Sequence, residues 1–480
     1  MQHTDMWAQD PAATYGYAGG AAVNRSAANT SRASVQSVLS AALNLRNSKR
    51  RTTLSTHTDA LDGTAAPTAP TITGNRWLQL GLGLVCMMAI SSPQYVWTLM
   101  TKPLGAKLGI GLPELQVTFS ILVVLQAFFS PLQGALIDRF KPRLLISVGT
   151  LMAGASWVLA SYAHSVPMLY LTYGGVGGLG TGIVYVGVVG LMVRWFPDRR
   201  GFAAGVVAAG YGMGAILTTF PIASSLAARG VESTLWLFGI VFAAVGFIAA
   251  QGLRMPPVDL GLSVSSAQTP ITSRDYRPSD MLKRPLFWLM FLMMTMMATS
   301  GLMVTSQMAT FATDFGVSKV LVFGLAALPL ALTIDRFTNG LTRPLFGWVS
   351  DRVGRENTMA FAFALEAVAM TLWLLTRDNA VLFVLLSGVV FFGWGEIFSL
   401  FPSTLTDTFG TRYATANYGW LYISFGIGSI FGGPLAALLH QQARSWIPVF
   451  GCAIGLDVAT AALAVFVLKP ARGRFIGAER

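Results

Sequence analysis

GALIDRFKPR, at residues 134–143, and GWVSDRVGRE, at residues 347–356, are the two stretches that decide the fold. Each follows a long apolar run, and each places a glycine four residues before the dipeptide Asp-Arg. Asp138 and Asp351 are therefore as far apart in the chain as the two glycines, Gly134 and Gly347. A spacing shared in this way predicts that one structural unit occurs twice in the chain.

A second pair of motifs repeats at nearly the same spacing. RRGFAAG ends at Gly205 and TRYATANYG ends at Gly419, so these two glycines are only one position further apart than the two aspartates. Two loop pairs with one spacing indicate a duplicated unit of six membrane spans. Duplicated units of this kind are the architecture of secondary transporters, in which the substrate site lies near the bilayer midplane at the interface of the repeats.

Long apolar runs dominate the composition. Of 480 residues, 53% are hydrophobic and 11% are charged, whereas about 25% of the residues of a soluble protein are charged. A helix needs about 20 apolar residues to cross the hydrocarbon. We therefore predict an all-α membrane protein with twelve transmembrane helices in two six-helix pseudo-repeats. The expected spans are residues 77–100, 115–137, 144–163, 167–193, 202–226, 234–253, 286–312, 320–349, 357–375, 380–402, 414–439 and 446–468.

Composition also divides the chain into regions. Small polar residues are abundant in region 1–75, which is typical of a disordered tail. The loops and tails on the membrane side that holds the termini and the central linker contain 25 Lys and Arg residues, whereas the loops on the opposite side contain 6. This asymmetry predicts that both termini are cytoplasmic. The expected regions are a disordered cytoplasmic N-terminal tail (1–75), an N-terminal six-helix bundle (76–253), a cytoplasmic central linker (254–285), a C-terminal six-helix bundle (286–468) and a cytoplasmic C-terminal tail (469–480).

Several classes of function lack support in the sequence. The four histidines are scattered, and Cys86 and Cys452 both fall in apolar runs, so neither a metal site nor a disulfide framework is predicted. The glycines at 175, 177 and 180 form GxGxxG, but without the strand and the βαβ unit that nucleotide binding requires. We predict no cofactor, no metal, no binding of ATP or nucleic acid and no enzymatic activity. The oligomeric state is left open, with a monomer as the default.

Charged residues inside the eighth run are the main functional signal. Counting back from Asp351 at ~1.5 Å per residue places the membrane midplane near residue 341, between Arg336 and Arg343. The two arginines are seven residues apart and share a helix face with Asn339. A buried arginine costs about 2.5–3.5 kcal/mol on insertion scales, and a guanidinium group is well suited to bind a carboxylate. This face therefore predicts a site for an organic anion.

A structural ion-pair network is the alternative interpretation of these charges. Asp335 is the neighbour of Arg336 in the sequence, although it points ~100° away from it on a helix. Glu396, in the tenth run, is a second candidate counter-ion for either arginine, and it is also the candidate for carrying a proton together with the anion. Glu366 and Asp457 lie at membrane depth too, and structural pairing is the default interpretation for them.

The Gly-x-x-x-Asp-Arg loop after the second and eighth runs, together with twelve runs and a central linker, resembles the major facilitator superfamily. The resemblance implies alternating access, with loop charges that hold the cytoplasmic gate shut. The first loop departs from the usual pattern, because Lys141 stands before Pro142 where a glycine is common. The gate residues implied by the resemblance are Asp138, Arg139, Arg143, Asp351, Arg352 and Arg355.

Between residues 75 and 468 the chain more narrowly resembles the oxalate/formate antiporter family. RWFPDRRG (194–201) and LFPSTLTDTFG (400–410) are the most specific motifs, and NGLTRP (339–344) carries the family's substrate-binding arginine at Arg343. The resemblance implies a secondary active transporter of small carboxylates in the cell membrane, or the inner membrane of a bacterium. The implied partners are small organic anions and membrane lipid. The pocket residues implied are Gln94, Tyr95, Tyr185, Tyr211, Trp394 and Tyr422.

Three pocket positions depart from the antiporter pattern: Phe398 replaces a tyrosine and Tyr422 a tryptophan. The third departure concerns charge, because the family places a lysine where this chain has Phe425. A dianion such as oxalate is well held by two cations, and the loss of one leaves a negative charge uncompensated. Either Arg336 supplies the missing charge, or the substrate is a monoanion such as formate, acetate, lactate or pyruvate. The alternatives to carboxylate antiport are therefore a proton-coupled monocarboxylate symporter and, less favoured, a transporter-like sensor with the long N-terminal tail.

Overall fold

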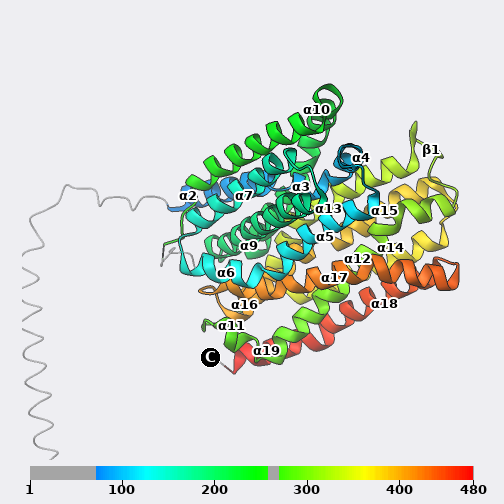
Figure 1. Cartoon of the computed structure of the whole chain (residues 1–480). Coiled ribbons are helices and arrows are strands. Elements are labelled where there is room, and N and C mark those ends of the chain that lie inside the picture. Colours follow the sequence, from blue (N-terminus) through cyan, green and yellow to red (C-terminus); the bar gives the residue numbers. More distant parts are fainter. Residues whose placement is uncertain (1–71, 258–269, 479–480) are drawn as a thin grey trace, which may run out of the picture. The chain divides into compact units, whose positions relative to one another are not determined.

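The computed structural model describes residues 72–257 and 270–478, so most of the predicted N-terminal tail and part of the predicted linker lie outside the described residues. Helices make up almost all of the described chain (Figure 1). They are α2 (Ile72–Ala89), α3 (Ser92–Tyr95), α4 (Trp97–Leu108), α5 (Leu112–Phe128), α6 (Ser130–Arg139), α7 (Pro142–Ser161), α8 (Val166–Leu169), the π-helical η1 (Tyr170–Val176), α9 (Gly177–Trp195), α10 (Arg200–Gln251), α11 (Pro278–Met281), α12 (Pro285–Asp314), α13 (Ala327–Val353), α14 (Arg355–Leu375), α15 (Ala380–Trp394), α16 (Ile397–Phe409), α17 (Ala414–Ala443), α18 (Ile447–Leu463), the π-helical η2 (Ala464–Leu468) and α19 (Lys469–Gly477).

Eight helical segments of the described chain are long and apolar enough to cross a membrane. Two further candidates are bent pairs: the α2–α3 segment with α4, bent by 48°, and α5 with α6, bent by 46°. α13 has 27 residues, but Asp335, Arg336 and Arg343 interrupt its apolar sequence. These helices suit a multi-pass membrane protein. The expected count of twelve spans and the two-repeat arrangement stay predictions.

Local sequence explains the main breaks between helices. α10 covers two expected spans, 202–226 and 234–253, and between them Gly230 has φ 77° and ψ 178°, a conformation that glycine adopts without steric cost. Residues Leu321–Val322 and Leu325–Ala326 form β1 and β2, a short antiparallel hairpin before α13. α19 continues the helical chain to Gly477, so most of the predicted C-terminal tail is helical.

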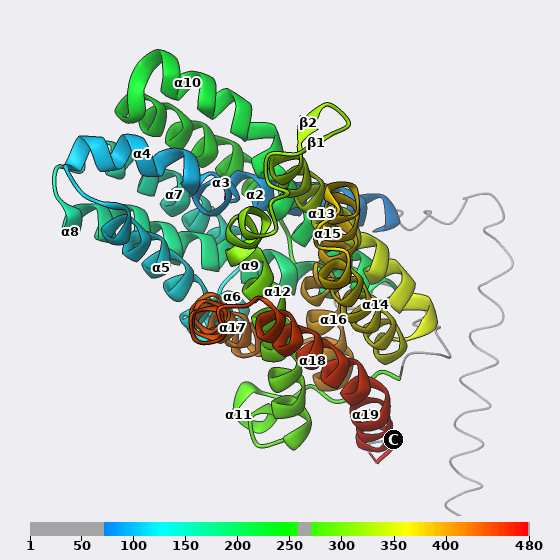
Figure 2. The ribbon, with the colours of Figure 1, turned by 90° about the vertical axis from the view of Figure 1, so that its right-hand side faces the viewer.

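The helices form two groups, α2–α10 and α12–α19, which we call the first and second halves (Figure 2). The halves meet mainly where α10 packs on α13 and where α6 packs on α17. Buried apolar side chains fill the interior of both halves. On α12, for example, Met290, Met293, Met294 and Met297 are all fully buried, and their flexible side chains fill irregular gaps.

The two crossings between the halves use glycine in the same way. A Cβ atom at Gly205, on α10, would overlap the carbonyl oxygen of Arg343, on α13. A Cβ atom at Gly419, on α17, would overlap the carbonyl oxygen of Ser130, on α6. Ser130 and Arg343 are as far apart in the sequence as the repeated loops that contain Asp138 and Asp351. The motif glycines therefore permit equivalent close contacts at two places in the fold.

Candidate functional site

Asp138, in the last turn of α6, joins the first half to the second. Its carboxylate forms an ion pair with Arg194, at the end of α9. It also accepts a hydrogen bond of 2.8 Å from the backbone N–H of Ala416, in the first turn of α17. A carboxylate is favourable at this end of a helix, where backbone N–H groups lack partners and the helix dipole is positive. Asp138 thus holds the start of α17 against the first half.

Asp351, near the end of α13, makes the corresponding contact from the second half. Its two carboxylate oxygens accept hydrogen bonds of 2.9 Å from the backbone N–H groups of Gly201 and Phe202, in the first turn of α10. It also forms an ion pair of 2.6 Å with Arg355. The donors on α10 and α17 belong to the second pair of repeated motifs, so the two aspartates hold equivalent helix ends. We call the surface that contains Asp138 and Asp351 the ion-pair face.

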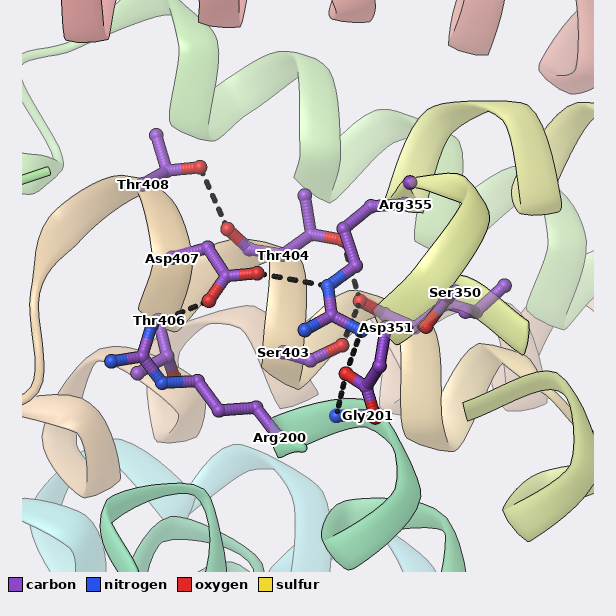
Figure 3. Close-up of polar contacts among 12 residues, drawn as sticks. Arg200, Gly201, Ser350, Asp351, Arg355, Ser403, Thr404, Thr406, Asp407 and Thr408 are labelled. Atoms are coloured by element: carbon purple, nitrogen blue, oxygen red, sulfur yellow. Dashed lines mark hydrogen bonds and ion pairs between the residues drawn. The ribbon is translucent and has the colours of Figure 1, made fainter. Parts of the chain in front are cut away.

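Asp407, on α16, lies at the centre of a buried charge network on this face (Figure 3). One oxygen lies 2.5 Å from Nη1 of Arg200, at the start of α10, and the other lies 2.8 Å from Nε of Arg355. The Asp407 side chain is 1% exposed, and removing one partner of such a buried pair is strongly destabilising. The contact with Arg200 therefore ties the two halves together.

The first and second halves differ in how they pair these charges. Asp407 follows Arg194 at the same spacing at which Asp351 follows Asp138, so the two pairs occupy equivalent positions. In the first half, Asp138 pairs directly with Arg194. In the second half both positions are acidic, and Arg355 bridges them. Asp407 also forms an ion pair with Arg200, which belongs to the first half.

Three of the six predicted gate residues make other contacts. The guanidinium carbon of Arg139 lies 5.9 Å from the ring centroid of its neighbour Phe140, and that of Arg352 lies 3.7 Å from the ring of Trp348. Arg143 donates hydrogen bonds to a glutamine on α10. The structure thus brings Asp138, Asp351 and Arg355 into the contacts of the ion-pair face and leaves the other three outside them.

α19 and the central linker attach to the second half beside Asp407. Arg472, which is fully buried on α19, donates from Nε to the Thr408 hydroxyl at 2.8 Å and from Nη1 to Glu356 at 2.5 Å. Its Nη2 donates to the carbonyl oxygen of Pro270 at 2.6 Å. Arg472 is absent from the predicted functional residues, because the composition of the last residues predicts a tail there.

Arg343 is 1% exposed in the middle of α13. Its Nη1 donates to the carbonyl oxygen of Ala208 at 2.6 Å, and its Nη2 donates to Asn339 Oδ1 at 2.7 Å. Its guanidinium carbon lies 4.5 Å from the ring centroid of Phe398. All three partners are neutral, so these contacts hold the guanidinium in place without cancelling its charge.

A cavity of about 280 Å³ extends along α13 from Arg343 towards the end of the fold opposite the ion-pair face. Arg336 lines it, whereas Arg343 lies directly behind its lining residues Asn339 and Phe398. Both halves contribute to the wall. The lining residues are Gln94, Tyr95, Thr98, Phe119, Gly212, Leu302, Thr305, Leu332, Asp335, Arg336, Asn339, Phe391, Trp394, Phe398 and Phe425.

A layer of buried tyrosines lies behind the cavity. The ring centroid of Tyr185 lies 5.1 Å from that of Tyr211 and 4.9 Å from that of Tyr422. The Tyr211 hydroxyl donates to Gln94 at 2.6 Å, and Gln126 donates to the Tyr422 hydroxyl at 3.2 Å. These three predicted pocket residues are therefore brought together next to the cavity but do not line it in this structure.

Comparisons with known proteins agree with this arrangement. A family model described as Major Facilitator Superfamily matches residues 80–335 and 326–480. The chain belongs to the major facilitator superfamily. It is 34% identical over 403 residues to an oxalate:formate antiporter of Oxalobacter formigenes, which covers 84% of this chain and 93% of that protein. It is 27% identical over 360 residues to YhjX, an uncharacterized MFS-type transporter of Escherichia coli strain K12, with 74% of this chain and 86% of that protein covered.

A solved structure supports the fold of this superfamily. The transporter FucP in its outward conformation matches with a TM-score of 0.63 and 13% sequence identity, covering 82% of this chain and 99% of that one. The predicted resemblance to the superfamily and to its oxalate/formate antiporters is thus confirmed, and the protein is a multi-pass membrane transporter of this superfamily.

Buried carboxyl groups form a second notable feature of this major facilitator protein. Glu366, on α14, Glu396, between α15 and α16, and Asp457, on α18, are all 0% exposed. Within the described residues, none of their oxygens has a partner at hydrogen-bond geometry. Glu366 interacts electrostatically with the other two, and Glu396 interacts with Arg343 without forming an ion pair in the described chain. The predicted role of Glu396 as a counter-ion stays a prediction.

Asp335, the other predicted counter-ion, lines the cavity of the transporter. Its residue is 5% exposed, and neither carboxylate oxygen has a partner at hydrogen-bond geometry among the described residues. The neighbouring Ser387 hydroxyl donates to a backbone carbonyl instead. Arg336 is exposed beside Asp335, and the two form no ion pair in the described chain. The cavity therefore holds an arginine and a carboxyl group, each with bonding capacity left for a ligand.

Proposed function

We propose that this transporter exchanges small carboxylates across the cell membrane by alternating access, with Arg343 and Arg336 supplying the positive charge of the site. The observation that carries the proposal is the position of two guanidinium groups, Arg336 in the cavity wall and Arg343 directly behind it, each without an acidic partner in the described chain. The relative in Oxalobacter formigenes is named as an oxalate:formate antiporter, which supports the same class of substrate.

Arg343 and Arg336 would hold the anion at different depths. Arg336 is exposed at the cavity wall, so it would meet an entering carboxylate first. Arg343 would receive the carboxylate if the Asn339 side chain turned away from its Nη2. Guanidinium groups bind carboxylates with two parallel hydrogen bonds, and such charge-assisted bonds are roughly twice as strong as neutral ones.

The cavity favours a monocarboxylate over a dianion. Phe391, Trp394, Phe398 and Phe425 form an apolar wall, which suits a substrate with a small apolar end. The Asp335 side chain on the same cavity supplies no positive charge for a second carboxylate. Formate, acetate, lactate and pyruvate fit this description better than oxalate does.

Alternating access would use the ion-pair face as the closed gate. We place this face in the cytoplasm, with both termini, because the basic residues outside the spans lie mainly on its side. The cavity lies on the opposite side of Arg343, so the carboxylate would enter from outside while Asp138, Asp351 and Asp407 hold the cytoplasmic end shut. Opening of this end requires their contacts between the halves to break.

Counterflow in proteoliposomes tests the exchange proposal. Vesicles loaded with formate, acetate, lactate, pyruvate or oxalate should take up external labelled monocarboxylate only when a carboxylate is present inside. Arg343→Lys should lower this exchange at least about tenfold, because lysine cannot form the paired hydrogen bonds of guanidinium. Arg377→Lys, at an arginine that lies near Phe315 and away from the cavity, is the matched control. Unchanged exchange in Arg343→Lys would show that the site is elsewhere.

A proton-coupled symporter of monocarboxylates is the second candidate, and the buried carboxyl groups favour it. An ionised carboxylate without a partner is costly to bury, yet Glu396 lies close enough to interact electrostatically with Arg343. Protonation of Glu396 together with anion binding would give a neutral loaded site. Glu366 and Asp457 would then be neighbours that change the proton affinity of Glu396.

The two candidates differ in their response to a pH gradient. Acid-stimulated net uptake that is lost in Glu396→Gln, while counterflow remains, would identify the symporter. Counterflow that ignores the pH gradient in both proteins would identify the exchanger. Gln has nearly the size of Glu, so the comparison isolates the proton from the packing of the buried site.

A further inference from the structure

A groove on the outside of the first half carries features that carboxylate transport does not use. It has a volume of about 430 Å³ and lies between α7 and the last turns of α10, at the end of the fold that holds the ion-pair face. Its lining residues are Lys141, Arg143, Leu144, Ser147, Val148, Leu151, Phe247 and Gln251.

One end of the groove is positively charged. Lys141 and Arg143 are both exposed there, and none of the described residues that line the groove is acidic. Arg143 therefore contributes a charge that its neighbours do not neutralise. Lys141 adds a second charge at the same end of the groove.

Hydrogen bonds fix the position of the Arg143 guanidinium. Its Nε and Nη2 donate to Gln251 Oε1 at 2.9 and 2.7 Å. The Gln251 amide donates to the Ser147 hydroxyl at 2.9 Å, and that hydroxyl donates to the Arg143 carbonyl oxygen at 2.6 Å. This closed set of bonds holds the guanidinium at the groove, with Nη1 available to a ligand.

The rest of the groove is apolar. Leu144, Val148 and Leu151 follow each other along one face of α7, and Phe247 faces them from α10. Their exposed fractions are 58%, 39%, 41% and 38%. In a membrane protein such side chains on the outer surface contact lipid chains. The groove thus continues from two cations at the membrane boundary into an apolar channel beside the hydrocarbon.

We propose that this groove binds an anionic phospholipid, with its phosphate on Lys141 and Arg143 and one acyl chain along Leu144, Val148, Leu151 and Phe247. Basic pockets between transmembrane helices bind anionic head groups in this way, and each basic residue near a membrane surface contributes roughly a fivefold gain. A free phosphate would use the charged end only, whereas a phospholipid uses both ends of the groove. The site is independent of the carboxylate site.

Lipid retention by the purified full chain tests the proposal. Dioleoyl phosphatidylglycerol and dioleoyl phosphatidylcholine are offered in equal amounts, and the lipid that stays bound is measured by native mass spectrometry. The wild-type chain should retain phosphatidylglycerol in preference. The double variant Lys141→Gln/Arg143→Gln should lose about 30-fold in affinity for it. Val148→Trp, which fills the channel and keeps both charges, should also lose retention.

Two controls separate this site from general attraction between anions and a basic protein. Arg277→Gln/Lys283→Gln removes two exposed basic residues of the central linker, outside the groove, and should retain phosphatidylglycerol like the wild type. Glycerol phosphate, which has the head-group charge without chains, should bind much more weakly than the lipid. Equal losses in both double variants, unchanged retention in Lys141→Gln/Arg143→Gln, or glycerol phosphate binding as tight as the lipid would each overturn the proposal.

Discussion

At the scale of single residues, Arg343 illustrates how a charge is kept inside a membrane helix bundle. Its two donor contacts go to a backbone carbonyl and to Asn339, and its flat face lies over Phe398. Neutral acceptors hold Nη1 and Nη2, and Nε has no partner in the described chain. An acidic partner would instead cancel the charge that the proposed anion requires. Arg343 is therefore held in place and remains positive.

The close contact at Gly205 gives a prediction at this scale. A Cβ atom there would overlap the Arg343 carbonyl oxygen, so Gly205→Ala should force α10 away from α13 and lower stability by about 1–3 kcal/mol. Thermal unfolding of the detergent-solubilised protein measures the effect. Gly81→Ala is the control, because nothing lies within 4 Å of a Cβ atom at that position. A Gly205→Ala protein as stable as Gly81→Ala would show that the crossing tolerates separation.

At the scale of elements, α19 is a structural part of the second half. Arg472 connects it to the Thr408 hydroxyl on α16, to Glu356 on α14 and to the linker at Pro270. It also lies 3.9 Å from Asp407, which an arginine of the first half contacts. The end of the described chain therefore supports the helix that carries the contact between the halves.

Replacing Arg472 tests this support. Arg472→Gln leaves Glu356 buried without its cation, and a broken buried pair costs about 3–5 kcal/mol. We expect a clear fall in the midpoint of thermal unfolding. Arg474→Gln, on the same helix but exposed, should change the stability by less than about 1 kcal/mol. Similar midpoints for the two variants would mean that α19 contributes little to the fold.

Helices and loop motifs can be predicted from local sequence, whereas contacts between distant residues cannot. The apolar runs and the repeated Gly-x-x-x-Asp-Arg loops predict helices and the positions of Asp138 and Asp351, because both signals are local. The contact of Arg200 with Asp407 joins distant parts of the chain and has no local signal, although both residues lie in the motifs RWFPDRRG and LFPSTLTDTFG. The superfamily resemblance implies a gate role for Arg143, whose hydrogen bonds in this structure go to a glutamine on α10 that is distant in the sequence.

At the candidate site, too, local sequence predicts where a residue lies along its helix but not which residues it contacts. The predicted midplane position of Arg343 comes from counting along one helix. Its acceptor at Ala208 lies on α10, and Gln126, which contacts Tyr422, lies on α5. Such partners depend on how the halves pack. The family resemblance predicts Tyr185 at the pocket wall, and packing instead places it one layer behind.

At the scale of the whole molecule, the contacts that join the halves on the ion-pair face are few and polar. Asp138 and Asp351 each accept hydrogen bonds from the first turn of a helix in the other half. Hydrogen bonds of this kind contribute about 1.5–3 kcal/mol each, so an anion bound at the proposed carboxylate site would have to outweigh them for the face to open. The buried ion pair of Arg200 with Asp407 has no counterpart from the first half to the second. The position equivalent to Asp407 in the first half is Arg194, which is basic.

Loss of this additional contact should shift the transporter towards a state with its ion-pair face open. Arg200→Gln removes the charge of the first half from Asp407, whereas Arg355 and Asp407 remain paired within the second half. Spin labels at positions 254 and 469, which are exposed on different halves, report the opening by double electron–electron resonance in a chain without Cys86 and Cys452. We expect the population with the longer distance to rise at least about tenfold relative to the closed one.

Arg199→Gln is the matched control, because Arg199 is the sequence neighbour of Arg200 and pairs with Asp198 instead. Its distance distribution should equal that of the unsubstituted chain. If Arg200→Gln also left the distribution unchanged, the hydrogen bonds of Asp138 and Asp351 would suffice to keep the face closed. If it opened the face, the ion pair of Arg200 with Asp407 would be a contact that closure requires, one that Arg194, the equivalent of Asp407 in the first half, does not supply because it pairs with Asp138.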